Sequence, residues 1–131
     1  MDKSELEERL INFAVFIIEI TNGLSNTKAG NHLADQLVRS GTSHALNYGE
    51  AQNGESRKDF IHKIKIVLKE LRETSICLKI IERAKLCKSD EKIHIALKEN
   101  DELISIFVKS VETAQRNMDN EIRNSKINRK S

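Results

Sequence analysis

The sequence contains no proline and no tryptophan, and only five glycines interrupt its 131 residues. Proline is the strongest helix breaker, so its absence leaves helix formation open along the whole chain. Hydrophobic residues make up 38% and charged residues 32%, a balance typical of a folded chain rather than a disordered one. A chain of this length forms one domain, which buries roughly two-thirds of its unfolded surface. We therefore expect a single all-α domain.

Long hydrophobic runs are also missing, and we expect no secretory leader. Residues 10–20 are the most apolar stretch, but Asn12 and Glu19 interrupt it, and crossing a bilayer takes about 20 apolar residues. The polar, acidic start of the chain does not match a signal peptide. Cys77 and Cys87 match no metal-binding spacing and suit a reducing compartment, where they pack as small apolar residues. We expect a cytoplasmic protein.

Residue patterns of known catalytic and metal sites are absent or misplaced. There is no phosphate-cradling glycine-rich loop, no His-Glu-x-x-His motif and no nucleophile elbow. Residues 91–94 (Glu-Lys-Ile-His) match half of a bundle dimetal site, and residues 59–62 (Asp-Phe-Ile-His) imitate the other half. Both lie at helix starts, which are about 40 Å apart in antiparallel helices of this length. We expect no enzymatic activity, no metal and no cofactor.

Four helical segments follow from the spacing of apolar residues and from turn motifs. The first opens with a capping box at Ser4 to Glu7 and ends near Gly23. Short connections, including residues 53–55, favour antiparallel neighbours. The sequence therefore predicts an up-down-up-down four-helix bundle over residues 1–118. The predicted helices are about 4–23, 27–52, 56–87 and 89–118.

Charge is unevenly distributed. The net charge is +2, but residues 122–131 contain four basic residues and no acid, which leaves −2 for the rest. The basic residues are Arg123, Lys126, Arg129 and Lys130. The apolar period is lost after Met118, so we expect residues 119–131 to be a flexible basic tail. Its side chains suit contact with nucleic-acid phosphates, and the alternative is a solvated, disordered end. Only five aromatic residues occur, and none interleaves with a basic run, so no stacking platform for bases is predicted.

The second predicted helix is unusually poor in charge. From residue 29 to residue 49 only Asp35 and Arg39 are fully charged. Gly41 and Gly49 each cost up to about 1 kcal/mol relative to alanine, a cost that close packing offsets. A surface helix of a monomer needs one solvated face. We infer that this helix is buried on more than its core side, at a subunit interface. The alternative is a mildly polar, exposed face.

The second predicted helix also carries a histidine and a row of polar residues. His44 lies on the apolar edge, where a packed residue is more common than a ligand. Polar residues follow one another at helical spacing on another side of the helix. They are Gln36, Ser40, Ser43, Asn47 and Glu50.

Several short segments occur in the order and spacing of a known family. They are residues 36–43, 47–51, 56–60, Lys63 and residues 69–74. Over about residues 4–115 the chain resembles the bacterial four-helix-bundle family named after proteins encoded in intervening sequences of 23S ribosomal RNA genes. The resemblance implies a ring-like homopentamer, a link to RNA and no enzymatic activity. Similar proteins are accessory factors of diversity-generating retroelements, where they bind the reverse transcriptase and nucleic acid. Those proteins are strongly basic, whereas the body of this chain is slightly acidic.

The family motifs coincide with the polar positions of the second helix and with two glutamates of the third. We predict that Arg39 pairs with Glu70 or Glu73 in a partly buried network. The alternative is a set of ordinary surface pairs. The predicted network or interface residues are Gln36, Arg39, Ser40, Ser43, Asn47, Glu50, Glu70 and Glu73.

Two functions remain open at this point. The first is a non-catalytic homo-oligomer, pentameric by the resemblance, that acts as a binding or accessory module for RNA or for an RNA-bound protein such as a reverse transcriptase. The second is a structural or protein-interaction module with no nucleic-acid role.

Overall fold

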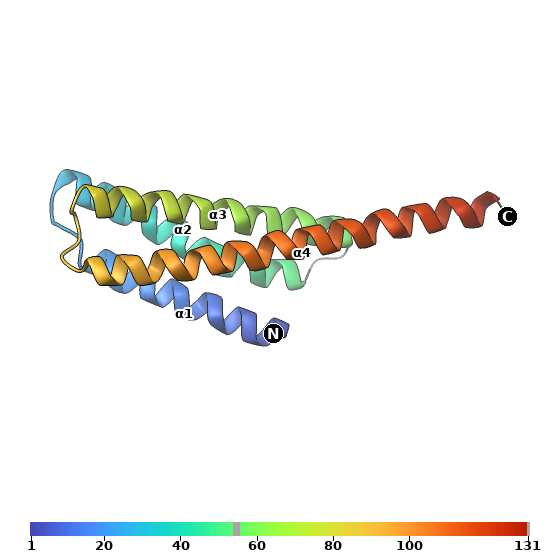
Figure 1. The fold of residues 1–131 in the computed structure, drawn as a ribbon, viewed down its shortest axis with the longest axis horizontal. Coiled ribbons are helices and arrows are strands. Elements are labelled where there is room, and N and C mark those ends of the chain that lie inside the picture. Colours follow the sequence, from blue (N-terminus) through green and yellow to red (C-terminus); the bar gives the residue numbers. More distant parts are fainter. Residues whose placement is uncertain (54–55, 131) are drawn as a thin grey trace.

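The computed structural model describes residues 1–53 and 56–130, and helices make up most of this part. Residues 54 and 55, in the predicted connection between the second and third helices, lie outside the described residues. The helices pack together as a bundle, from which the end of α4 projects (Figure 1). The all-α expectation is confirmed. The four helices are α1 (Lys3–Asn22), α2 (Lys28–Gln52), α3 (Arg57–Arg83) and α4 (Asp90–Lys130).

Side-chain caps start the first three helices. Thr27 and Ser56 cap α2 and α3, each accepting a hydrogen bond from the backbone N–H three residues on, at 3.0 and 3.1 Å. In α1 the capping box lies two residues earlier than expected. Asp2 accepts from the Glu5 N–H at 2.8 Å, and the Glu5 carboxylate accepts from the Asp2 N–H at 3.0 Å. The predicted cap at Ser4 is wrong because this Asp-x-x-Glu pair already satisfies both amides.

Two helix ends also differ from expectation. α3 ends at Arg83, four residues early, because Lys85 adopts a φ of 55° and the Leu86 N–H bonds the Ile81 carbonyl at 3.0 Å. α4 does not end near Met118 but continues to Lys130. No glycine or proline occurs after residue 54 to stop it, and an ion pair from α3 reaches α4 as late as Glu121.

Buried apolar side chains from all four helices form one core. The largest fully buried ones are Phe107, Leu10, Ile17, Ile20, Leu37, Ile64, Leu71, Leu78, Ile81, Ile93 and Leu103. Gly41 lets α1 and α2 approach closely, since a Cβ there would lie 2.5 Å from Ile17 Cγ2. The close packing expected at Gly41 thus occurs within the chain. At Gly49 none of the described residues would have an atom within 4 Å of a Cβ.

Polar contacts connect the helices and their loops near one end of the bundle. The α1–α2 and α3–α4 connections meet at one end, where the Ser25 N–H donates to the Leu86 carbonyl at 2.8 Å (Figure 1). Near that end His94 of α4 contacts Glu82 of α3. None of the helices described contains a stretch long and apolar enough to cross a bilayer.

Candidate interaction surfaces

Arg39 is the centre of a polar network between α2 and α3. It donates to Glu73 at 3.0 Å and to Gln36 at 3.2 Å, and its Nη1 lies 3.5 Å from Glu70 Oε2. The Arg39 side chain is 52% exposed, whereas that of Glu70 is 11% exposed. Burial raises the pKa of Glu70, nearby Glu73 raises it further, and Arg39 opposes both effects. The network therefore has a buried carboxylate on its inner side and an accessible guanidinium on its outer side.

Beneath this network lies a pair of fully buried hydroxyl groups. Ser40 Oγ and Thr74 Oγ1 are hydrogen-bonded at 3.0 Å, and Thr74 Oγ1 lies 2.9 Å from the Glu70 carbonyl. Thr74 has only one hydroxyl hydrogen, so donation to the carbonyl leaves Ser40 as donor to Thr74. The hydroxyl pair links α2 to α3 directly below Arg39.

The remaining predicted network residues do not join it. Ser43 and Asn47 are half-buried and donate to carbonyls one turn back on α2 itself, those of Arg39 and Ser43. Glu50 pairs with Lys63 of α3 at 2.6 Å, near the other end of α2. The structure therefore brings together Gln36, Arg39, Ser40, Glu70 and Glu73, and places the other three apart.

His44 is a packed residue, as expected. It is fully buried and its ring lies 5.5 Å from that of Phe13. Neither ring nitrogen has a hydrogen-bond partner among the described residues. Burial lowers the pKa of His44 to about 4, an effect that the Gly41 backbone only partly opposes. The imidazole is therefore neutral at pH 7. Within the described part of the chain, no three His, Cys, Asp or Glu side chains are grouped to hold a metal ion.

Exposed apolar side chains occur on the outer sides of α1 and α2. Val15 is 51% exposed and Leu46 is 70% exposed. On α1 the exposed positions follow one another at steps of four and three residues, so they share one side of the helix. We name this set the exposed apolar residues of α1 and α2. They are Ile11, Val15, Ile18, Val38 and Leu46.

The predicted basic tail is a projecting helix. Residues 119–129 are all exposed, and the end of α4 extends past the other helices (Figure 1). Arg123, Lys126 and Arg129 follow at steps of three residues, which keeps them toward one side of the helix. The backbone of Lys130 is helical, and its side chain lies outside the described residues. The last acidic residue, Glu121, accepts from Arg57 at 2.6 Å. The basic side chains are thus presented on a helix.

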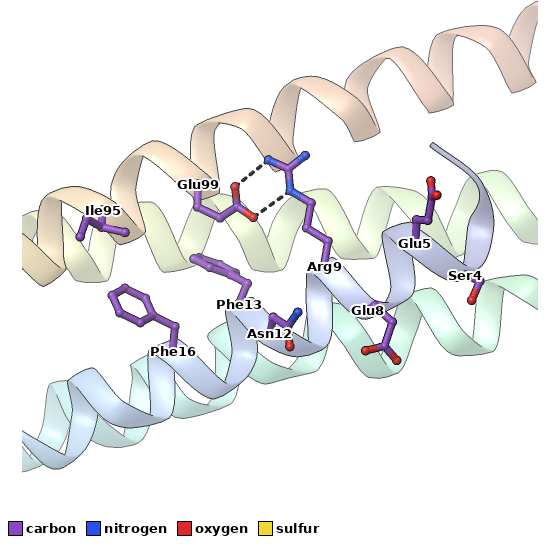
Figure 2. Close-up of a pocket in the computed structure, with 9 residues that line it drawn as sticks. All are labelled: Ser4, Glu5, Glu8, Arg9, Asn12, Phe13, Phe16, Ile95 and Glu99. Atoms are coloured by element: carbon purple, nitrogen blue, oxygen red, sulfur yellow. Dashed lines mark hydrogen bonds and ion pairs between the residues drawn. The ribbon is translucent and has the colours of Figure 1, made fainter.

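A groove of about 650 Å³ between α1 and α4 was not anticipated from the sequence. Figure 2 shows Phe13 and Phe16 of α1 pointing toward Ile95 of α4. Arg9 crosses from α1 to hold Glu99 through two hydrogen bonds of 2.6 and 2.8 Å, and these bonds raise the pKa of Arg9. The sequence signal was the pair of phenylalanines three residues apart, of which only one fits the core stripe. The remaining lining residues are Ser4, Glu5, Glu8 and Asn12.

Comparison with known proteins places the chain in a family. Residues 3–109 match the model of the 23S rRNA-intervening sequence proteins. This chain belongs to that family. A similar solved structure is described as a protein with unknown function from the S23 ribosomal protein family of Bacteroides thetaiotaomicron. It is 28% identical, covers 86% of this chain and 99% of its own, and superposes with a TM-score of 0.77. Among curated proteins no significant match was found.

The family match covers some of the surfaces described above but not the basic end of α4. In this 23S rRNA-intervening sequence protein, the α2–α3 polar network and the α1–α4 groove lie within residues 3–109. The basic residues from Arg123 onward lie beyond the match. The projecting basic helix is therefore an addition to the matched part of the bundle.

Proposed function

We propose that this chain is a non-catalytic, cytoplasmic binding module that assembles as a ring-like homopentamer and contacts RNA, or an RNA-bound protein, through the basic end of α4. The observation that carries the proposal is the projecting helix that presents Arg123, Lys126 and Arg129 to solvent. Family membership supports the link to ribosomal RNA genes. Lysine and arginine neutralise phosphate charge and release counterions, so such a helix suits sequence-independent RNA binding.

Assembly is supported by surfaces that a single chain leaves open. The exposed apolar residues of α1 and α2 lose contact with water when another subunit covers them. Arg39 remains half-exposed on the outer side of its network, where a neighbouring subunit can reach it. Five copies bring together about twenty basic side chains, and multivalency strengthens weak individual contacts.

The up-down-up-down order belongs to the same proposal. It is supported by side-chain contacts that join opposite ends of α3 and α4. Arg57 at the start of α3 pairs with Glu121 late in α4, whereas Glu82 near the end of α3 contacts His94 at the start of α4.

RNA binding is tested by its salt dependence. Binding of a labelled single-stranded RNA is measured from low to moderate salt for the natural chain and for the triple variant Arg123→Gln, Lys126→Gln, Arg129→Gln. The slope of log K against log salt is negative, and each lost phosphate contact makes it less steep by about 0.7 on single strands. A matched control removes three exposed lysines of α3 in the same way, Lys65, Lys69 and Lys79.

The outcomes separate the two candidate functions. A steep slope that flattens only in the α4 variant supports RNA contact through the basic helix. If the natural chain does not bind RNA even at low salt, the proposed RNA role is wrong. The structural or protein-interaction module then stands, which the net negative charge of residues 1–121 favours.

Assembly is tested by light scattering. A pentamer has five times the 14.9 kDa mass of one chain. We expect Leu46→Glu to reduce the mass without unfolding the chain, because this side chain is 70% exposed. Arg39→Ala is expected to lower both thermal stability and assembly, since it leaves Glu70 without its cation. Unchanged stability and mass in Arg39→Ala would show that the α2–α3 network is an ordinary surface pair.

A further inference from the structure

The α1–α4 groove combines an apolar floor with an acidic rim. Phe16 is half-buried and Ile95 is 51% exposed, so apolar surface faces solvent inside the groove (Figure 2). Among the described residues that line it are Glu5, Glu8 and Glu99 but only one cation, Arg9. Arg9 is already paired with Glu99 and with Glu102, at 2.6 and 2.7 Å. The groove therefore suits an occupant with apolar side chains flanked by positive charge.

The end of α4 has that composition. Residues 122–130 contain four basic residues, no acid and two exposed isoleucines, Ile122 at 48% and Ile127 at 57%. Five residues of helix separate the isoleucines by about 140° around the axis. A helix lying in a groove touches both walls, so each isoleucine can contact one of them. The nine residues span about 14 Å, and the groove wall from Ser4 to Phe16 spans about 18 Å.

The occupant must come from another molecule. α4 runs as one continuous helix from Asp90 to Lys130. Ile122 therefore lies about 35 Å along the axis from Glu99, where the same helix forms the groove wall. A segment cannot fold back onto its own helix without breaking it, so only a second copy can supply the segment.

We propose that the α1–α4 groove binds residues 122–130 of a second copy of this chain. The contact is head-to-tail, because the groove of one copy receives the helix end of the next, and such contacts close into rings or extend as filaments. The inference rests on the proposed homo-oligomer and adds the segment that joins neighbours. RNA and the groove therefore compete for residues 122–130, and the exposed apolar residues of α1 and α2 hold the copies together while RNA occupies the basic ends.

Mixed cysteine crosslinking tests the contact in the full-length chain. Cys77 and Cys87 are replaced by alanine, Ile95→Cys is placed in one population and Ile127→Cys in another, and the two are mixed under mild oxidation. We expect a disulfide-linked pair on a non-reducing gel. The control pairs Ile127→Cys with Ile80→Cys, a 45% exposed position of α3 that neither lines the groove nor belongs to the exposed apolar residues of α1 and α2. A yield no higher than that of this control overturns the inference.

Charge exchange tests the chemistry of the same contact. Glu8→Lys in the Ile95→Cys population is expected to lower the crosslinking yield at least five-fold at low salt. Adding Arg123→Glu to the Ile127→Cys population is expected to restore it. Failure of this rescue counts against the electrostatic pairing, provided that circular dichroism shows both variants folded.

Failure of the groove contact and failure of the proposed function give different experimental outcomes. Absent crosslinking with a pentameric mass overturns the groove contact and leaves the assembly intact. Crosslinking accompanied by loss of RNA binding at low salt supports the groove contact and removes the RNA role. Poly(U) RNA is expected to reduce the crosslinking yield, and an undiminished yield at saturating RNA would refute the shared use of residues 122–130.

Discussion

Two glycines of α2 offer the same substitution in opposite environments. A Cβ at Gly41 would lie 2.5 Å from Ile17 Cγ2, 3.1 Å from its Cγ1 and 3.2 Å from its Cβ. A Cβ at Gly49 would have no atom of the described part of the chain within 4 Å. Both glycines lie inside one helix, so alanine gives both the same gain in helix propensity. The difference in stability between the two variants therefore measures the packing between α1 and α2.

The expected magnitudes follow from these contacts. Gly49→Ala is expected to raise the free energy of unfolding by up to about 1 kcal/mol, the helix propensity difference. Gly41→Ala gains the same amount but overpacks a buried site, which costs about 1–3 kcal/mol or more. Ile17 cannot rotate away, because a β-branched side chain has one strongly preferred rotamer in a helix. We expect the upper part of that range and a net loss of about 1–2 kcal/mol.

Thermal and urea unfolding, followed by circular dichroism, measure both variants at one protein concentration. Replacing Ile17 with leucine removes the branch nearest to Gly41, so Gly41→Ala is expected to be less damaging in that background. Equal effects of the two glycine substitutions, or a larger loss at Gly49, would refute the reasoning. A loss at Gly49 would indicate that another surface covers this position.

Two further predictions concern single side chains. His44→Leu is expected to be at least as stable as the natural chain at pH 7, because the imidazole nitrogens have no hydrogen-bond partner within residues 1–53 and 56–130. Between pH 7 and pH 4 the natural chain is expected to lose about 3 kcal/mol relative to this variant, since the unfolded histidine is protonated near pH 6.5 and the folded one only near pH 4. Glu70 titrates in both proteins, so its contribution cancels when their free energies of unfolding in urea are subtracted at each pH. The remaining pH dependence belongs to His44. A difference that stays constant from pH 7 to pH 4 would contradict the prediction. Asp2→Ala is expected to lower the free energy of unfolding by about 0.5–1 kcal/mol, because it removes the cap of α1, whereas Ser4→Ala is expected to change it very little. Thermal unfolding of both variants measures the difference. A larger loss in Ser4→Ala would show that Ser4 caps the helix.

Much of the helical structure was predictable because its causes are local. The caps at Thr27 and Ser56 need only a side-chain oxygen and a backbone N–H three residues on. The core stripes follow from helical spacing of apolar residues. Local rules do not choose between two similar capping motifs, and the one at Asp2 rather than the one at Ser4 starts α1. Loss of the apolar period also does not mark the end of α4. A helix without a stop residue can continue after its core contacts end.

The interaction surfaces depended on tertiary structure. The pairing of Arg39 with the glutamates of α3 was predicted, but Ser43 and Asn47 proved to bond within α2. Fully buried Asn100, which donates to the Leu71 carbonyl at 2.8 Å, had no signal in the sequence.

Composition and spacing determined that this chain forms four helices with one apolar side each and a basic end. The fold decided that Gly41 meets Ile17, that His44 stays neutral and that Phe16 lines a groove at the edge of the core. The spacing of apolar residues shows which side of a helix is apolar, because this depends only on residues that are close in the sequence. The separation of two helices depends on how side chains from distant segments fill the space between them, and that is settled only when the helices pack.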